Sequence, residues 1–174
     1  MNPYIFRKYD IRGVVKTDFT TEIVNNIGRA FGTYVIRAGG TRIAISGDIR
    51  LTTPKMKGNF IQGLLDTGIN VVDMGIVPTP ANYFSMFYLD VDGAVQITGS
   101  HNPPEFNGIK FSFKQQAFYG DQIQNIRQLI ENADFELGNG SIKTIDIMKP
   151  YQKMLKDKIN IKKPLKVVMD CGNA

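Results

Sequence analysis

The sequence predicts an α/β fold in which a mixed, mostly parallel sheet is sandwiched between helices. Short, strand-like apolar runs alternate with segments of amphipathic helical spacing, an order typical of βαβ units. Of the 174 residues, 43% are hydrophobic, which excludes a disordered chain. No apolar run approaches the ~18 residues that a membrane-spanning helix needs, so no membrane partner is expected.

Helices are predicted where apolar residues recur with helical spacing between capping signals. From Thr21 they recur every three or four residues; Thr20 or Thr21 can cap the start, and Gly39-Gly40 end the helix. Thr53-Pro54 opens a second helix with a cap and a proline in its first turn, and Gly68 closes it. Further helices are expected over residues 81–88, over residues 121–131 and from Pro150 onward.

Strands are predicted between these helices. They span residues 42–46, 70–74, 94–98 and 109–113, after a short extended segment over 6–11 that turns at Arg12-Gly13. A last strand is expected over residues 165–170, and the given sequence holds no later helix or strand that could pack against it. We therefore expect a fragment, with one whole domain over residues 1–148 and, over residues 149–174, a connecting helix and the first strand of a truncated second domain.

The net charge of +5 is confined to the end of the chain. Residues 1–148 carry 14 basic and 14 acidic side chains, whereas residues 149–174 carry seven lysines and two aspartates. A neutral body argues against a nucleic-acid partner, although a nucleic-acid-binding domain driven by the basic tail remains an alternative. One cysteine and one histidine are too few for a Cys/His zinc site. The N-terminus has no charged segment followed by an apolar core, so a cytoplasmic protein is expected.

The chemistry of the chain concentrates in residues 98–110. This segment begins at the carboxyl end of a predicted strand, where open α/β sheets bind their ligands. It holds Ser100, the only histidine (His101), Asn102 and, after a glycine-flanked turn, Lys110. Neither a nucleophile elbow nor a phosphate-binding P-loop pattern is present. A serine among such groups suits a phosphate carrier, and a rigid surface turn is the structural alternative.

A family resemblance rests on several motifs in order along the chain. Thr98-Gly99-Ser100-His101-Asn102-Pro103, followed by Asn107-Gly108-Ile109-Lys110, resembles the phosphoserine loop of the α-D-phosphohexomutases. Phe6-Arg7-Lys8-Tyr9-Asp10-Ile11-Arg12-Gly13 is similar to the opening motif of their phosphomannomutase/phosphoglucomutase branch. Three weaker pieces follow the family's order: Asp48-Ile49-Arg50, Gly75-Ile76-Val77-Pro78-Thr79-Pro80 and Asp170-Cys171-Gly172-Asn173-Ala174.

The resemblance implies an isomerase that interconverts hexose 1-phosphate and hexose 6-phosphate of mannose, glucose or both. Residues 1–148 would be its N-terminal catalytic domain, and Ser100 would be the phosphoserine that passes a phosphoryl group to the sugar through a hexose 1,6-bisphosphate intermediate. Mg²⁺ would bind the Ser100 phosphate and otherwise take ligands from domains beyond this chain. Lys110 would transfer a proton, and His101 would orient or assist the phosphoserine.

Three further residues receive roles from the same resemblance, and each has a structural alternative. Arg12 would contact the substrate phosphate, Tyr9 would border the site, and Asn102 would fix the loop. Alternatively, Tyr9 is a core aromatic residue of the first strand, and Arg12 is a solvated charge in a turn. Asp48 and Arg50 are expected to form a capping pair at a helix start rather than a catalytic group.

Two other functions remain open at this level. Phosphoglucosamine mutases belong to the same family but usually open with a Thr-Asp-Gly-Ile-Arg-Gly type of segment, so Tyr9-Asp10-Ile11-Arg12-Gly13 favours the hexose branch. A non-catalytic module that binds sugar phosphates is the second alternative. The expected partners are a hexose phosphate substrate and the remaining domains of the same protein, and the fragment alone is expected to be inactive.

Overall fold

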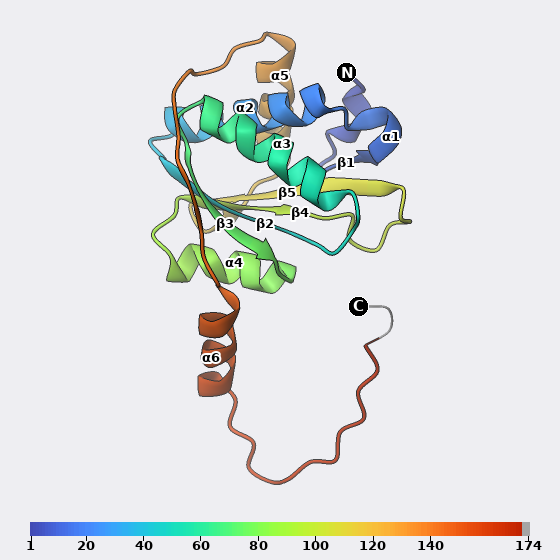
Figure 1. Ribbon diagram of the computed structural model, residues 1–174, viewed down its shortest axis with the longest axis vertical. Helices are drawn as coiled ribbons and strands as arrows, with labels where there is room; N and C mark the ends of the chain where they lie inside the picture. Colours follow the sequence, from blue (N-terminus) through green and yellow to red (C-terminus); the bar gives the residue numbers. More distant parts are fainter. Residues whose placement is uncertain (172–174) are drawn as a thin grey trace.

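A seven-stranded mixed sheet forms the middle layer of the computed structural model, which describes residues 1–171 (Figure 1). The strand order is β1-β5-β4-β2-β3-β7, and β6 pairs with β5. β5 runs antiparallel to its neighbours, whereas β4, β2, β3 and β7 are parallel to one another. The strands are β1 (Ile11–Val14), β2 (Arg42–Gly47), β3 (Asn70–Ile76), β4 (Gly93–Ile97), β5 (Phe106–Phe113), β6 (Gln116–Ala117) and β7 (Ile142–Thr144). The predicted mixed α/β architecture is confirmed.

Helices cover both faces of this sheet. A 3-10 turn, η1 (Pro3–Ile5), precedes the first strand. The α-helices are α1 (Val15–Asp18), α2 (Thr21–Arg37), α3 (Thr53–Asp66), α4 (Thr79–Tyr88), α5 (Asp121–Glu131) and α6 (Met148–Lys158). α2, α3 and α5 lie on one face and α4 on the other (Figure 1).

The larger core lies between the sheet and the layer of α2, α3 and α5. The predicted cap of α2 is confirmed, because Thr20 Oγ1 accepts a hydrogen bond from the Ile23 N–H at 3.2 Å. Phe31 of α2 is fully buried at the centre of an aromatic cluster with Phe60, Phe111 and Phe118. This core holds the helices against the sheet and fixes where its strands end.

A smaller core and a buried polar network join α4 to the opposite face. Ala44 and Ala94 leave room for the helix to approach the two central strands. The Asn82 amide of α4 donates to Ser46 Oγ at 2.7 Å and to the Val95 carbonyl at 2.9 Å. Gln96 in turn donates to the Val77 carbonyl at 3.0 Å. These bonds satisfy polar groups that would otherwise be costly to bury.

The structure corrects the sequence prediction at both ends of the chain. Arg12 and Gly13 lie within β1, not in a turn, because β1 pairs with β5 and places Arg12 opposite Gly108. The strand expected over residues 165–170 is not formed: residues 159–171 contain no helix or strand and follow a wide loop that leaves α6 and turns back (Figure 1). The short strands β6 and β7 were not predicted. No helix within residues 1–171 is both long and apolar enough to cross a bilayer.

Candidate active site

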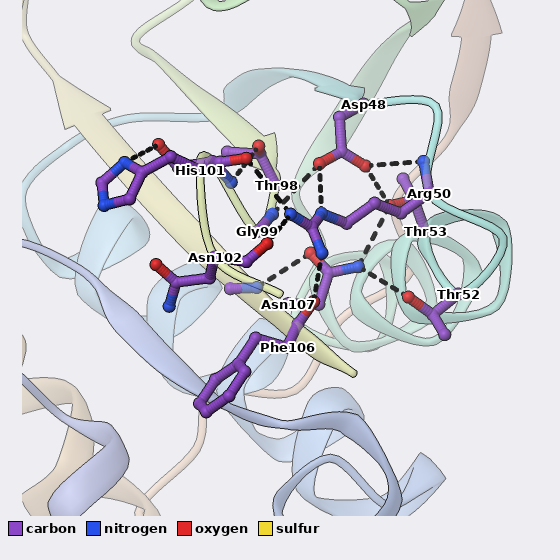
Figure 2. Close-up of polar contacts among 12 residues, drawn as sticks. Asp48, Arg50, Thr52, Thr53, Thr98, Gly99, His101, Asn102, Phe106 and Asn107 are labelled. Atoms are coloured by element: carbon purple, nitrogen blue, oxygen red, sulfur yellow. Dashed lines mark hydrogen bonds and ion pairs between the residues drawn. The ribbon is translucent and has the colours of Figure 1, made fainter. Parts of the chain in front are cut away.

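The predicted serine loop lies where β4 leaves the sheet, beside the end of its parallel neighbour β2. Gly47 of β2 is in register with Ile97 of β4, so the segments after residues 47 and 97 emerge side by side. The Asp48 N–H donates to the Ile97 carbonyl at 2.9 Å, which extends the pairing by one residue. The loop over residues 98–105 therefore lies at the carboxyl ends of two parallel strands, the usual ligand-binding edge of such sheets (Figure 2).

Ser100 has a left-handed backbone conformation, with φ at +54°. Few residues other than glycine adopt this conformation, and it persists only where the surrounding contacts impose it. The Ser100 N–H donates to Thr98 Oγ1 at 2.9 Å, and its own Oγ lies 3.2 Å from His101 Nδ1. Both Ser100 and His101 are exposed, so the hydroxyl is open to a substrate. The structure brings these two predicted residues together.

Arg12 reaches across from β1 to the base of this loop. Its guanidinium donates to the Gly99 carbonyl at 3.1 Å and to Asn102 Oδ1 at 3.0 Å. It also pairs with Asp10 at 2.5 Å, and its side chain is only 7% exposed. Arg12 is therefore not a solvated surface charge, and it bonds the Asn102 side chain to β1.

Lys110 joins the same cluster through Asp10. Its ammonium Nζ lies 3.6 Å from Asp10 Oδ2, the oxygen that also accepts from Arg12. Lys110 stands on β5 opposite Gln96 of β4, and its side chain is 29% exposed. One buried carboxylate thus ties two predicted site cations to each other, a link that the sequence analysis did not foresee.

Tyr9 does not lie in the core, and no described contact joins its side chain to Ser100. It is 63% exposed, and its ring packs against Tyr119 with the centroids 6.2 Å apart. The core interpretation of Tyr9 is therefore wrong, although Phe6 beside it is buried. No hydrogen bond or ring contact joins Tyr9 to residues 98–105 in the described part of the chain. Its place at the border of the site stays a prediction.

Asp48 and Arg50 hold the loop from the other side, which the sequence analysis missed. Asp48 does contact the start of α3, because its Oδ1 accepts from Thr53 Oγ1 at 2.6 Å. Its second oxygen, however, accepts from the Gly99 N–H at 3.0 Å. The Arg50 carbonyl accepts from the N–H of Thr53, the first residue of α3, at 2.9 Å. Its guanidinium does not cap the helix and instead donates to backbone carbonyls of the serine loop and of Phe106 (Figure 2). The two residues bind the loop as well as the helix.

Asn107 connects the returning strand β5 to the same helix start. Its amide donates to Thr52 Oγ1 at 3.0 Å and to Thr53 Oγ1 at 3.1 Å, and its Oδ1 accepts from the Gly108 N–H at 2.8 Å. Asn107 is fully buried. Both ends of the loop are thus anchored to the elements beneath it, whereas Ser100, His101 and residues 103–105 between these ends are exposed to solvent.

Comparison with known proteins identifies the family of the chain. Residues 3–137 match the family described as phosphoglucomutase/phosphomannomutase, alpha/beta/alpha domain I. The chain belongs to this family. A phosphomannomutase/phosphoglucomutase of Pseudomonas aeruginosa is 44% identical to it over 169 residues, and a phosphoglucomutase of Neisseria meningitidis serogroup B is 37% identical over 171 residues.

Solved structures of family members have the same fold. A phosphoglucomutase/phosphomannomutase family protein from Burkholderia thailandensis superposes with a TM-score of 0.91 at 39% identity, covering 95% of this chain and 38% of its own. A protein described as a phosphomannomutase from Thermus thermophilus gives a TM-score of 0.79 at 26% identity and covers 89% of this chain. The aligned residues make up 97% of this chain but only 36% of the Pseudomonas protein and 37% of the Neisseria protein. The chain therefore spans little more than a third of the length of these relatives.

The described residues of this family member do not form a complete metal site. Within residues 1–171, no group of three or more histidine, cysteine, aspartate or glutamate side chains could hold a metal ion. Asp48 already accepts three hydrogen bonds and pairs with Arg50. Asp10 is engaged by Arg12 and Lys110.

Proposed function

We propose that this chain is the phosphoserine-bearing domain of a phosphohexomutase, which interconverts the 1-phosphate and 6-phosphate of mannose, glucose or both. The observation that carries the proposal is the presentation of Ser100. The loop's backbone is bonded to Arg12, Asp48 and Arg50, while the Ser100 hydroxyl stands exposed at its outer edge. A hydroxyl held in this way suits repeated gain and loss of a phosphoryl group, which depends on position more than on covalent assistance.

In the proposed reaction the bond between Ser100 Oγ and phosphorus breaks as a hydroxyl oxygen of the hexose phosphate bonds to the same phosphorus. The hydroxyl proton passes to a base, for which Lys110 is the candidate, and a hexose 1,6-bisphosphate results. In the second step the other phosphoryl group of the sugar moves to Ser100 Oγ, and the proton returns to the sugar oxygen it leaves. The second step regenerates the phosphoserine, so the exchange is balanced without a further reactant.

The neighbouring residues would hold this serine and its charge. Arg12 is fixed by Asp10 and Asn102, and three of its five N–H donors are used, so two remain for a phosphate oxygen. His101, 3.2 Å from Ser100 Oγ, would orient the phosphoserine. Tyr9 would border the sugar.

Mg²⁺ would supply charge neutralisation at the transferring phosphoryl group. The family resemblance also implies hexose 1,6-bisphosphate as the activator. We propose that the remaining metal ligands and the sugar-selecting groups belong to further domains of the same cytoplasmic protein. On this proposal residues 1–148 form the catalytic domain, residues 149–174 lead into the next, and this chain alone is inactive.

The test measures phosphate on the serine and turnover in the complete protein. Intact mass should show a single phosphoryl group after exposure to hexose 1,6-bisphosphate, and Ser100→Ala should abolish both that mass and the conversion of hexose 1-phosphate. Ser141→Ala is the matched control, because this exposed serine bonds Asn70 away from the loop, and it should retain both. Turnover that persists in Ser100→Ala would refute the carrier role.

Binding of hexose phosphates without phosphorylation would instead support the non-catalytic module, and preference for glucosamine phosphates would support a phosphoglucosamine mutase.

A further inference from the structure

Arg50 contacts four backbone carbonyls, three in the serine loop and one at Phe106, where β5 begins. One terminal nitrogen donates to the carbonyls of Pro103 at 2.8 Å and Phe106 at 3.0 Å. The other donates to those of Ser100 at 3.2 Å and Asn102 at 2.5 Å. The side chain is 17% exposed, and its Nε lies 3.3 Å from Asp48 Oδ2. A single guanidinium therefore bonds residues at both ends and in the middle of the loop (Figure 2).

Gly99 lies directly against this guanidinium. A Cβ built on Gly99 would stand 2.4 Å from both Cζ and Nε of Arg50, closer than real side-chain atoms approach. The Gly99 N–H and the Arg50 Nε also meet at the same oxygen of Asp48. The absence of a side chain at position 99 is thus what lets the guanidinium occupy the inside of the loop.

The bonds to Arg50 also set the direction of the loop's carbonyl dipoles. The carbonyls of residues 100, 102, 103 and 106 point toward Arg50, and that of Gly99 points toward Arg12. The partial negative charges of these oxygens are therefore turned toward cations in the protein. A phosphoryl group on Ser100 brings about −1.5 to −2 charge and would be repelled by carbonyl oxygens on its own side.

We propose that Arg50 is a positioning residue, which holds the loop around its guanidinium so that Ser100 is presented in its left-handed conformation and the carbonyls face away from the phosphoryl group. The inference rests on the proposed function of Ser100. Arg50 acts through the loop backbone and does not touch the sugar. A lysine at this position keeps the charge but lacks the planar fork that reaches four carbonyls at once.

The test compares variants of the complete protein in steady-state conversion of hexose 1-phosphate to hexose 6-phosphate. We expect Arg50→Ala and Arg50→Lys to lower kcat by about 10- to 100-fold, with KM changed by less than about threefold, because misplacement of a reacting group slows chemistry. Guanidinium ion at millimolar concentration should partly restore Arg50→Ala but not Arg50→Lys. Gly99→Ala, which displaces the same guanidinium without removing it, should lower kcat similarly.

The matched control is Arg42→Ala. Arg42 lies at the opposite end of β2 and pairs with the 98%-exposed Asp90, so its removal should leave kcat unchanged. Thermal unfolding of each variant shows whether it folds. If Arg50→Ala does not fold, Gly99→Ala takes its place in the kinetic comparison. Arg50 variants as active as Arg42→Ala would overturn the inference, as would a kcat loss that guanidinium does not restore and Gly99→Ala does not reproduce. Absence of phosphate and turnover in the wild type would instead refute the proposed function.

Discussion

Replacing Asp48 with asparagine tests how strongly the base of the serine loop is held. Both carboxylate oxygens accept hydrogen bonds: Oδ1 from the Arg50 N–H at 3.0 Å and Thr53 Oγ1 at 2.6 Å, and Oδ2 from the Gly99 N–H at 3.0 Å. The Asp48→Asn variant keeps the shape of the side chain but replaces one of these oxygens with an NH₂ group. In either amide orientation, that group faces a backbone N–H and cannot accept from it.

The expected cost follows from these contacts. One backbone N–H loses its hydrogen-bond partner. The remaining hydrogen bonds become weaker because the acceptor is no longer charged, and a charge-assisted bond is roughly twice as strong as a neutral one. Because the Asp48 side chain is 21% exposed, water offsets part of the loss. We expect about 2 kcal/mol of destabilisation. For a chain of this size that lowers the unfolding midpoint by about 4–8 °C.

The assay is thermal and urea unfolding of the 174-residue chain, followed by circular dichroism. Asp90→Asn is the control, because Asp90 also pairs with an arginine but its side chain is 98% exposed, so little change is expected. An Asp48→Asn midpoint indistinguishable from that of Asp90→Asn would refute the reasoning. It would mean that the bonds to Gly99 and Arg50 are replaced by water at no cost.

Three further predictions concern other parts of the fold. Asp10→Asn should lower kcat of the complete protein by about tenfold or more in steady-state assays, because Lys110 loses the partner that holds it 3.6 Å away. Phe31→Ala should destabilise the chain by about 3–5 kcal/mol in urea, since the ring is fully buried among aromatic neighbours. Hydrogen bonding from Arg37 lowers the pKa of Asp134, so this carboxylate stabilises the fold above its unfolded-state pKa, and the contribution is lost as pH falls through the folded-state pKa. The difference in unfolding midpoint between wild type and Arg37→Ala should therefore be present at about pH 7, vanish by about pH 2 and shrink with added salt.

Elements whose signals are local were predicted well. The bounds expected for α5, residues 121–131, are those in the structure, and α2 begins after Thr20 as its capping pattern indicates. The apolar spacing of both helices and the capping pattern of α2 are local signals, and neither depends on what lies across the sheet. The central strands β2, β3 and β4 were also placed, because each is a short, mostly apolar segment that separates two helical patterns.

Elements that exist only through pairing were predicted poorly. Arg12-Gly13 has the composition of a turn, yet it forms β1 because Gly108 across the ladder lets the chains approach closely; a Cβ there would lie 2.7 Å from the Ile11 carbonyl oxygen. β7 has three exposed residues and lies at the sheet edge beside β3, with no apolar run to mark it. Conversely, residues 165–170 have the composition of a strand but do not form one, and no strand of residues 1–171 pairs with them.

The same reason explains why the serine loop stands out in the sequence, whereas the contact of Arg50 with this loop does not. Ser100, His101 and Asn102 are adjacent in the chain, so their shared chemistry is visible in one motif. Arg50 is fifty residues away from Ser100 and meets it only because β2 and β4 are neighbours, although α3, β3 and α4 intervene along the chain. Sequence periodicity predicts the strands but not their order. Once that order is known, the pairing of Gly47 with Ile97 brings the two following segments together, and an arginine beside a glycine at that edge becomes the natural group to hold the loop.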